Sequence, residues 1–180
     1  MDSLEDVKKD LMNYVKKSVD VDFRIRGYEP VKPVRAQGAR ISSRYGKRDP
    51  LPYHYGIDIT AGGDDVKIYA AYSGTVEFVG IWPGMTIKDK WGYYIIINGN
   101  NGLYHVYAHL KEGSAVVRVD QEEPVKAGDE LGIMGNTGFS QGKHLHFELL
   151  KRYDGNGKIL NESKDTCPEP VEVENLYNKK

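Results

Sequence analysis

A His-Leu-His step at residues 144–146 is the first feature of the sequence that could do chemistry. It lies in a strand-like run, His-Leu-His-Phe-Glu-Leu-Leu. Because strand side chains alternate between faces, His144 and His146 point the same way while Leu145 and Phe147 point into the core. Their Cα atoms would lie roughly 7 Å apart. One metal site could then use both imidazoles, or bind one and hold the other beside the metal.

His54 and Asp58 form a second candidate pair. Gly56 lies between them and Ile-Asp-Ile-Thr follows, which disfavours a helix. In a straight strand the two residues would lie about 13 Å apart, too far to share one ion with bonds of about 2 Å. A shared metal therefore requires the chain to bend, and glycine tolerates a bend that other residues resist.

Two imidazoles and one carboxylate make a chemically sensible catalytic zinc set, because they leave a fourth position for water. Zinc lowers the pKa of that water to about 7, and hydrolysis then needs a base and a donor to the oxyanion. His109, in Tyr-Ala-His-Leu, and either His144 or His146 are available for these roles. Spacing alone does not say which of them binds metal, and it leaves open that all are ordinary side chains. We interpret His105 as a solvated or hydrogen-bonded histidine.

Short β-rich segments separated by turn signals must position these groups. The turn signals include residues 62–63, 98–102, 127–129 and 135–138, which are rich in Gly and Asn. The pattern predicts a mostly β fold, with an antiparallel β-sheet arranged as a sandwich or open barrel. The expected strands cover residues 57–60, 67–81, 93–98, 103–110, 116–119 and 144–150.

An amphipathic segment precedes these strands. Leu4, Val7 and Leu11 recur at helical spacing, which predicts a short N-terminal helix, either packed on the domain or serving as an oligomerisation arm. The expected organisation is this helix at residues 1–20, a linker at 21–40 that wraps onto the main domain, a β domain at 41–165 and a polar C-terminal tail at 166–180 with a frayed end.

Composition argues against several classes of function. The net charge of −1 gives no case for binding nucleic acid or an anionic membrane surface. No apolar run reaches the roughly 18 residues of a transmembrane helix, so we expect no membrane insertion. Cys167 is the only cysteine, which excludes an intrachain disulfide. The first residues are charged and lack the apolar stretch of a secretory signal.

In their order and surroundings, these motifs resemble the LytM/lysostaphin-type zinc metalloendopeptidases, a family of peptidoglycan hydrolases. The resemblance rests on His54-x-x-x-Asp58, Tyr-Ala-His109-Leu and His144-Leu-His146-Phe-Glu. It extends to residues 41–46 and 68–76 and to the glycine-marked turns at 128–132 and 135–138. It covers roughly residues 41–150, and several motifs in one order make it specific.

This resemblance implies a site. One zinc ion (Zn2+) per chain would be bound by His54, Asp58 and His146, while His109 and His144 would be the catalytic pair that handles the water and stabilises the oxyanion. The family fold is an antiparallel β structure with its site in a groove, which makes residues 41–165 a zinc metallopeptidase domain. The usual substrates are peptide bonds in peptidoglycan stem peptides or cross-bridges.

Glu148 and the loop at residues 81–91 lie outside the set of five site residues. Glu148 lies on the same face as His146, so we expect it to contact that ring rather than to act as the base. Residues 81–91 form an extra, partly charged loop relative to the family. We expect this loop to form a wall of the groove, and substrate choice is therefore not transferable.

Two alternatives compete with the enzyme. One is a non-catalytic LytM-like domain that activates a wall amidase, but such members typically lose ligands and all five positions are filled here. The other is a structural phage component with a vestigial site. Without a signal, a wall-degrading, bacteriolytic protease would reach the cell wall as part of a phage virion, docked on a larger assembly through the N-terminal helix, or by another export route.

Overall fold

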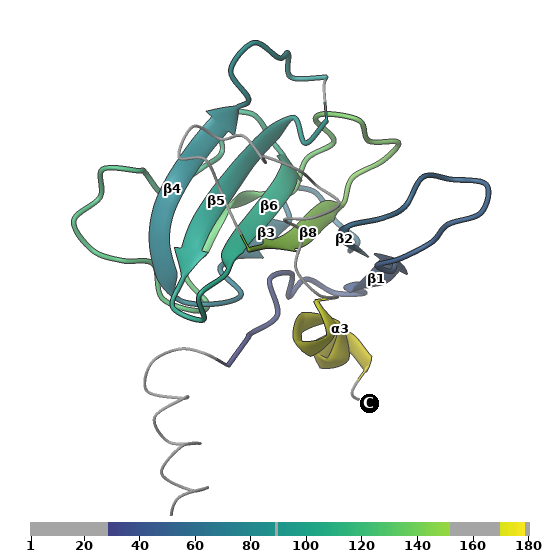
Figure 1. Cartoon of the computed structure of the whole chain (residues 1–180), viewed down its shortest axis with the longest axis horizontal. Helices are drawn as coiled ribbons and strands as arrows, with labels where there is room; N and C mark the ends of the chain where they lie inside the picture. Colours follow the sequence, from purple (N-terminus) through teal and green to yellow (C-terminus); the bar gives the residue numbers. More distant parts are fainter. Residues whose placement is uncertain (1–28, 89, 152–169, 179–180) are drawn as a thin grey trace, which may run out of the picture.

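A six-stranded antiparallel sheet dominates the fold. The computed structural model describes residues 29–88, 90–151 and 170–178. The sheet has the strand order β1-β2-β8-β6-β5-β4, and a two-stranded antiparallel sheet pairs β3 with β7 (Figure 1). The strands are β1 (Arg40–Ser43), β2 (Gly56–Thr60), β3 (Lys67–Tyr69), β4 (Gly74–Ile81), β5 (Tyr93–Gly99), β6 (Tyr104–Leu110), β7 (Glu130–Ile133) and β8 (Leu145–Leu150). The prediction of a mostly β, antiparallel fold is confirmed.

The main hydrophobic core lies on one face of the large sheet. Alternate residues of the central strands point to this side, where they meet the small sheet. β3 lies behind β6 and β8 in the view of Figure 1. The fully buried side chains of this core include Ile57, Ile59, Ile68, Ile95, Ile97, Tyr107, Leu131 and Phe147.

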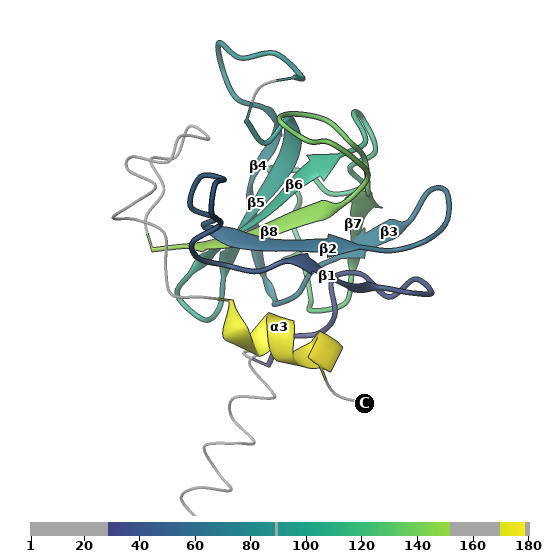
Figure 2. The same cartoon turned by 90° about the vertical axis from the view of Figure 1, so that its right-hand side faces the viewer.

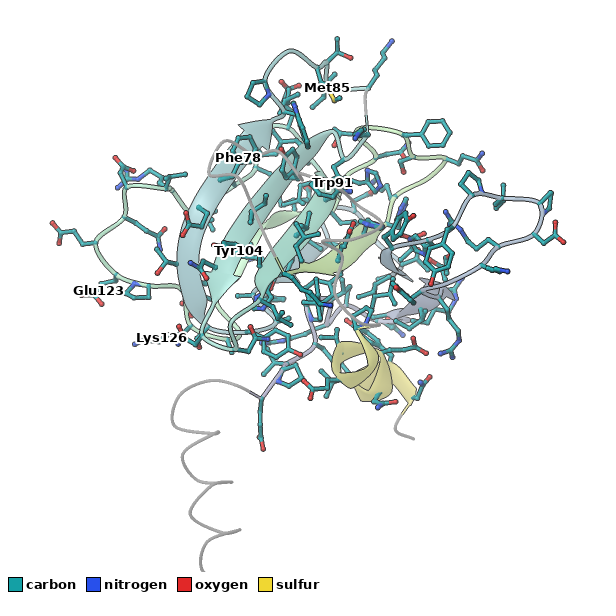
Figure 3. The ribbon with its side chains drawn as sticks, viewed as in Figure 1. Phe78, Met85, Trp91, Tyr104, Glu123 and Lys126 are labelled. Atoms are coloured by element: carbon teal, nitrogen blue, oxygen red, sulfur yellow. The ribbon has the colours of Figure 1, made fainter. Side chains whose placement is uncertain are left out.

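The opposite face of the large sheet carries a smaller apolar cluster around Tyr94, Ile96 and Val106. Figure 3 shows Phe78, Trp91 and Tyr104 over this side of β4 to β6. Because Ile57 and Ile59 of β2 and Leu145 and Phe147 of β8 face the main core, the intervening Asp58 and His146 face this second side. Strand alternation alone therefore gathers polar groups on one face.

Three strand expectations differ from the structure. Residues 67–81 form two strands, β3 and β4, which belong to different sheets and are separated by residues 70–73. Residues 116–119 form no strand, and Val116 and Val119 are exposed. β7 lies where the sequence suggested only glycine-marked turns, and it pairs with β3. Its Gly132 leaves room for Leu110 and Ser114, which approach within 3.2 Å of the Cβ position.

The two ends of the chain differ in what the structure describes. The helix expected at residues 1–20 lies outside the described residues. Within the expected polar tail, residues Val171–Asn178 form helix α3, which lies beside β1 (Figure 2). Val173 of this helix is fully buried in the main core, which explains why a mostly polar segment folds back. None of the helices in the described part is long and apolar enough to cross a membrane.

Candidate metal centre

His54, Asp58 and His146 converge on one point. His54 Nε2 and His146 Nδ1 each lie 3.0 Å from Asp58 Oδ1, and they lie 3.1 Å from each other. His54 and His146 are buried, and the Asp58 side chain is 14% exposed. Within the described residues this is the one group of three or more His, Cys, Asp or Glu side chains close enough to hold a metal ion.

The sheet register brings Asp58 and His146 together. Asp58 on β2 is the direct partner of His146 on β8, and Ala108 on β6 is the partner of His146 on the other side. Directly opposed side chains in an antiparallel pair lie about 5 Å apart at Cβ, which is close enough to share an ion. The two residues are 88 positions apart in sequence, so no spacing rule could show this relationship.

His54 reaches the same point because it precedes β2 rather than lying in it. A two-residue bridge pairs His54 with Gly46, with both backbone hydrogen bonds at 2.9 Å. The chain turns between this bridge and the start of β2 at Gly56, so the 13 Å separation of a straight strand does not apply. The bend that a shared metal requires is therefore present.

Both ligand imidazoles are held from behind. His54 Nδ1 lies 2.8 Å from the carbonyl oxygen of Arg44, which can only accept a hydrogen, so Nδ1 carries it and the lone pair of Nε2 faces the site. His146 Nε2 lies 3.1 Å from Glu148 Oε2 and donates to it. Glu148 therefore contacts His146 as the sequence suggested.

Two carboxylates, those of Asp58 and Glu148, surround His146 and favour a cation at this position. Burial alone would lower the pKa of His146, but hydrogen bonds to Asp58 and Glu148 raise it to about 9. Burial likewise opposes ionisation of Asp58, yet hydrogen bonds from His146 and His54 hold its pKa well below the ordinary value. The carboxylates of Asp58 and Glu148 therefore favour a positive charge on His146 between them. A metal ion bound at Nδ1 would supply that charge in place of the proton that Nδ1 carries in the metal-free protein.

Two imidazole nitrogens and a carboxylate oxygen match the donor set that zinc prefers at catalytic sites. Hydrogen-bonded second nitrogens are also typical of metal-ligating histidines. The residues present therefore fit a zinc ion. Arg48 lies at the edge of this site, with a guanidinium nitrogen 3.8 Å from the other carboxylate oxygen of Asp58.

His109 reaches the site through an unusual backbone conformation. In a regular strand His109 would share the face of Tyr107, which belongs to the main core. Its φ of 63° interrupts the alternation, a conformation that is uncommon outside glycine. Its ring consequently lies 4.7 Å from the ring of His144 and 5.8 Å from that of His146, measured between centroids.

The protonation of His109 is set by its partner. Its Nδ1 donates to the carbonyl oxygen of Thr137 at 2.7 Å, so the lone pair of Nε2 is directed away from that contact. Burial lowers the pKa of His109 to about 3, and repulsion from His146 and His144 adds to this effect. In the metal-free protein this imidazole is therefore neutral at ordinary pH.

His144 lies at the entrance of β8 and is the more accessible member of the pair. Its Nδ1 donates to the carbonyl oxygen of Gly142 at 2.8 Å, and Ser140 Oγ lies 3.2 Å away. Its Nε2 lies 3.6 Å from Asp58 Oδ1. All five residues selected from the sequence are thus brought into one cluster.

The loop between β4 and β5 contacts the segment that supports His109 and His144. Gly138 N donates to the carbonyl oxygen of Ile87, and Phe139 N donates to that of Lys90, both at 2.7 Å. Met85 marks the outer part of this loop in Figure 3. The extra loop seen in the sequence is therefore tied to Gly138 and Phe139, the two residues between Thr137 and Ser140.

Sequence reasoning did not identify the groups that act through their backbone. Arg44 and Thr137 orient His54 and His109 with carbonyl oxygens, which every residue has, so the residue type gives no signal. Arg48 and Ser140 use side chains but follow no spacing motif. The sequence Asn-Thr-Gly at 136–138 indicates only a turn, although that turn presents the Thr137 carbonyl to His109.

Known proteins share this sequence pattern. A profile of peptidase family M23 matches residues 52–161, which include all five clustered residues. The chain is 32% identical over 136 residues to the DD-carboxypeptidase/endopeptidase Mpg of Neisseria meningitidis serogroup B, covering 73% of this chain and 28% of that protein. It is 39% identical over 100 residues to the murein hydrolase activator NlpD of Salmonella typhimurium, covering 56% and 23%. The chain thus spans roughly a quarter of the length of these relatives.

Solved structures share the fold. The catalytic domain of the prophage-encoded M23 protein EnpA from Enterococcus faecalis, crystallised as a variant, aligns with a TM-score of 0.56 and 29% identity over 74% of this chain and 95% of that one. Lysostaphin from Staphylococcus simulans aligns with a TM-score of 0.56 and 26% identity over 78% of this chain and 52% of that one.

Proposed function

Because the chain belongs to peptidase family M23, we propose that it is a zinc-dependent endopeptidase that cuts peptide bonds in bacterial peptidoglycan. One observation carries the proposal: the two ring nitrogens of His54 and His146 and the carboxylate of Asp58 face one another, while the outer ring nitrogens are held by Arg44 and Glu148. This arrangement suits a metal ligand set, with one zinc ion per chain.

Zinc bound by these three residues would supply Lewis acidity, which makes water nucleophilic near neutral pH. The residues of the chain supply the other functions. His109, with its Nδ1 hydrogen held by Thr137, presents Nε2 as a proton acceptor. His144, with Nδ1 held by Gly142, is positioned to donate a hydrogen bond to the oxyanion when its Nε2 is protonated. The rigid supports behind both rings reduce the cost of orienting them.

The experiment combines metal analysis with product analysis. Purified full-length protein should bind one zinc ion per chain, and mass spectrometry of muropeptides should show new peptide ends after digestion of wall material. Several wall chemotypes should be compared, because the bond and the target are open. His109→Ala protein, with zinc retained, serves as the inactive control. Zinc-replete protein that leaves every peptidoglycan intact would refute the proposal.

A second function has one observation in its favour. The chain is 39% identical to a protein named as a murein hydrolase activator. An activator needs a docking surface but no ordered ligand set, so the complete cluster favours the enzyme. If the protein stimulates a wall amidase and a His146→Ala variant does so equally well, the activator function would be the correct one.

We also propose that the protein acts at the cell wall as a phage virion component, docked on a larger assembly through residues 1–20. A prophage origin of the EnpA relative supports this setting. All proposed ligands follow residue 53, so a chain lacking residues 1–20 should still cleave soluble wall peptide. The same deletion should abolish incorporation into virions; unchanged incorporation would remove this role from the segment.

A further inference from the structure

A chain of contacts links the C-terminal helix to the ligand His54. Glu174 of α3 forms an ion pair with the guanidinium of Arg44. The carbonyl oxygen of the same Arg44 accepts the Nδ1 hydrogen of His54 at 2.8 Å. Arg44 and Glu174 both lie outside residues 52–161, so the family match includes neither of them.

Helix α3 is a fixed support for this ion pair. Val173 is fully buried in the main core, next in sequence to Glu174. At the other end of the helix, the Tyr177 hydroxyl donates to the carbonyl oxygen of Val34 at 2.8 Å and accepts from its backbone nitrogen at 2.9 Å. Tyr72 also donates to Glu172 at 2.9 Å. Contacts on both sides of Glu174 therefore hold its backbone in place.

Glu174 is buried, so its carboxylate depends on the ion pair with Arg44 for a compensating positive charge. The carboxylate is 5% exposed, and one of its oxygens has no hydrogen-bond partner among the described residues. A buried carboxylate without a cation is costly, so Glu174 strongly favours conformations in which the Arg44 guanidinium is near. The Arg44 side chain is 60% exposed and would otherwise have considerable rotational freedom.

We infer that Glu174 is a positioning residue for the metal site: by holding Arg44, it fixes the carbonyl that orients His54. This inference rests on the proposed zinc site, and it assigns a role to a segment that the family match leaves out. The contacts behind a ligating histidine typically affect metal affinity 10- to 100-fold when they are removed. Here the carbonyl itself remains and only its anchor is lost, so we expect a smaller effect of about three- to tenfold.

A set of conservative variants tests this inference in the full chain. The variants Glu174→Gln and Arg44→Gln remove the charge of either partner, and the double variant removes both. Glu172→Gln is the matched control, because it makes the same change on the same helix without touching Arg44 and keeps a side-chain oxygen that can accept from the Tyr72 hydroxyl. The measurements are the rate of zinc release to excess chelator and the absorption spectrum of the cobalt-substituted protein.

Each single variant should release zinc about three- to tenfold faster than the wild type, and the double variant should be no faster than either, because both act through one contact. The cobalt spectrum should change in these variants and stay unchanged in Glu172→Gln. Arg44→Lys, which keeps the cation, should restore most of the retention. Wild-type release rates in Glu174→Gln, or equal acceleration in Glu172→Gln, would overturn the inference. A wild-type protein that binds no zinc would instead overturn the proposed function.

Discussion

The imidazole of His146 lies directly against the backbone of Gly56. A Cβ atom at position 56 would lie 2.8 Å from Cε1 and 2.9 Å from Nε2 of that ring, and 2.5 Å from the carbonyl oxygen of Phe147. The glycine is therefore required by the space that a metal ligand occupies. The sequence had suggested a bend as the reason for this glycine, but φ at Gly56 is not in the left-handed region.

The Gly56→Ala variant should lose both stability and metal. The added methyl must displace the carbonyl of Phe147 or the ring of His146, and such overpacking costs about 1–3 kcal/mol of unfolding free energy. Chemical denaturation and zinc analysis would measure the two effects. Gly142→Ala is the control, because nothing lies within 4 Å of its Cβ position. Full zinc occupancy in Gly56→Ala would contradict this account of the site.

The histidines should separate into two classes when each is replaced by alanine. His109→Ala should keep zinc but lose activity by about 10²- to 10⁴-fold, the usual contribution of a general acid or base. His144→Ala should behave in the same way, whereas His146→Ala should lose the metal. Zinc analysis and wall-peptide turnover on the same preparations would test this. If His109→Ala loses zinc, then His109 is a ligand and the roles proposed here are wrong.

Glu148 should tune the metal affinity through His146. The Glu148→Gln variant keeps an oxygen that can accept the Nε2 hydrogen but removes the charge, so zinc affinity should fall by roughly tenfold. Competition with a chelator of known affinity would measure this change. Glu130→Gln provides a control on the outside of the fold, where Glu130 pairs with Lys67 at 2.6 Å. Equal affinities in the two variants would show that Glu148 acts only in packing.

Local chemistry was visible in the sequence, whereas the order of the sheet was not. Alternation in a strand predicted correctly that His146 and Glu148 share a face, because this depends only on neighbouring residues. The pairing of β2 with β8 joins segments almost 90 residues apart, and no local pattern encodes it. The sequence did not predict the position of His109 either, because its positive φ takes the ring off the face that regular strand alternation would give it.

Helix α3 shows a different limit of sequence reasoning. Its eight residues include two glutamates and two asparagines, and this composition suggests a solvated tail. Its position depends on three separated contacts: burial of Val173, the pairing of Tyr177 with Val34, and the ion pair of Glu174. None of these is a pattern with a period, so the helix could be recognised only once the core against which it packs was known.

His105 should make the fold sensitive to acid independently of the metal site. It is fully buried beside Tyr72 and Phe147, its Nε2 donates to Asn101 Oδ1 at 2.9 Å, and its Nδ1 has no hydrogen-bond partner among the residues that the structure describes. Burial lowers the pKa of His105 to about 3 from the ordinary 6.5. Below pH 6.5, His105 therefore binds a proton in the unfolded chain but stays neutral in the folded chain. The free energy of unfolding falls as the pH drops from 6.5 toward 3.

The expected size of this effect can be isolated with the His105→Leu variant. At pH 5 a histidine with this shift costs roughly 2 kcal/mol of unfolding free energy relative to neutral pH, and leucine removes that term. Asn101 still accepts from the backbone nitrogen of Leu103 in the variant. Urea denaturation of both zinc-free proteins at pH 7 and pH 5 should therefore show a smaller loss of stability in the variant, by roughly the same 2 kcal/mol. The other buried histidines contribute equally to both proteins and cancel in this comparison. Parallel losses in the two proteins would mean that His105 takes up its proton in the folded state as readily as in the unfolded one, which would contradict its lowered pKa.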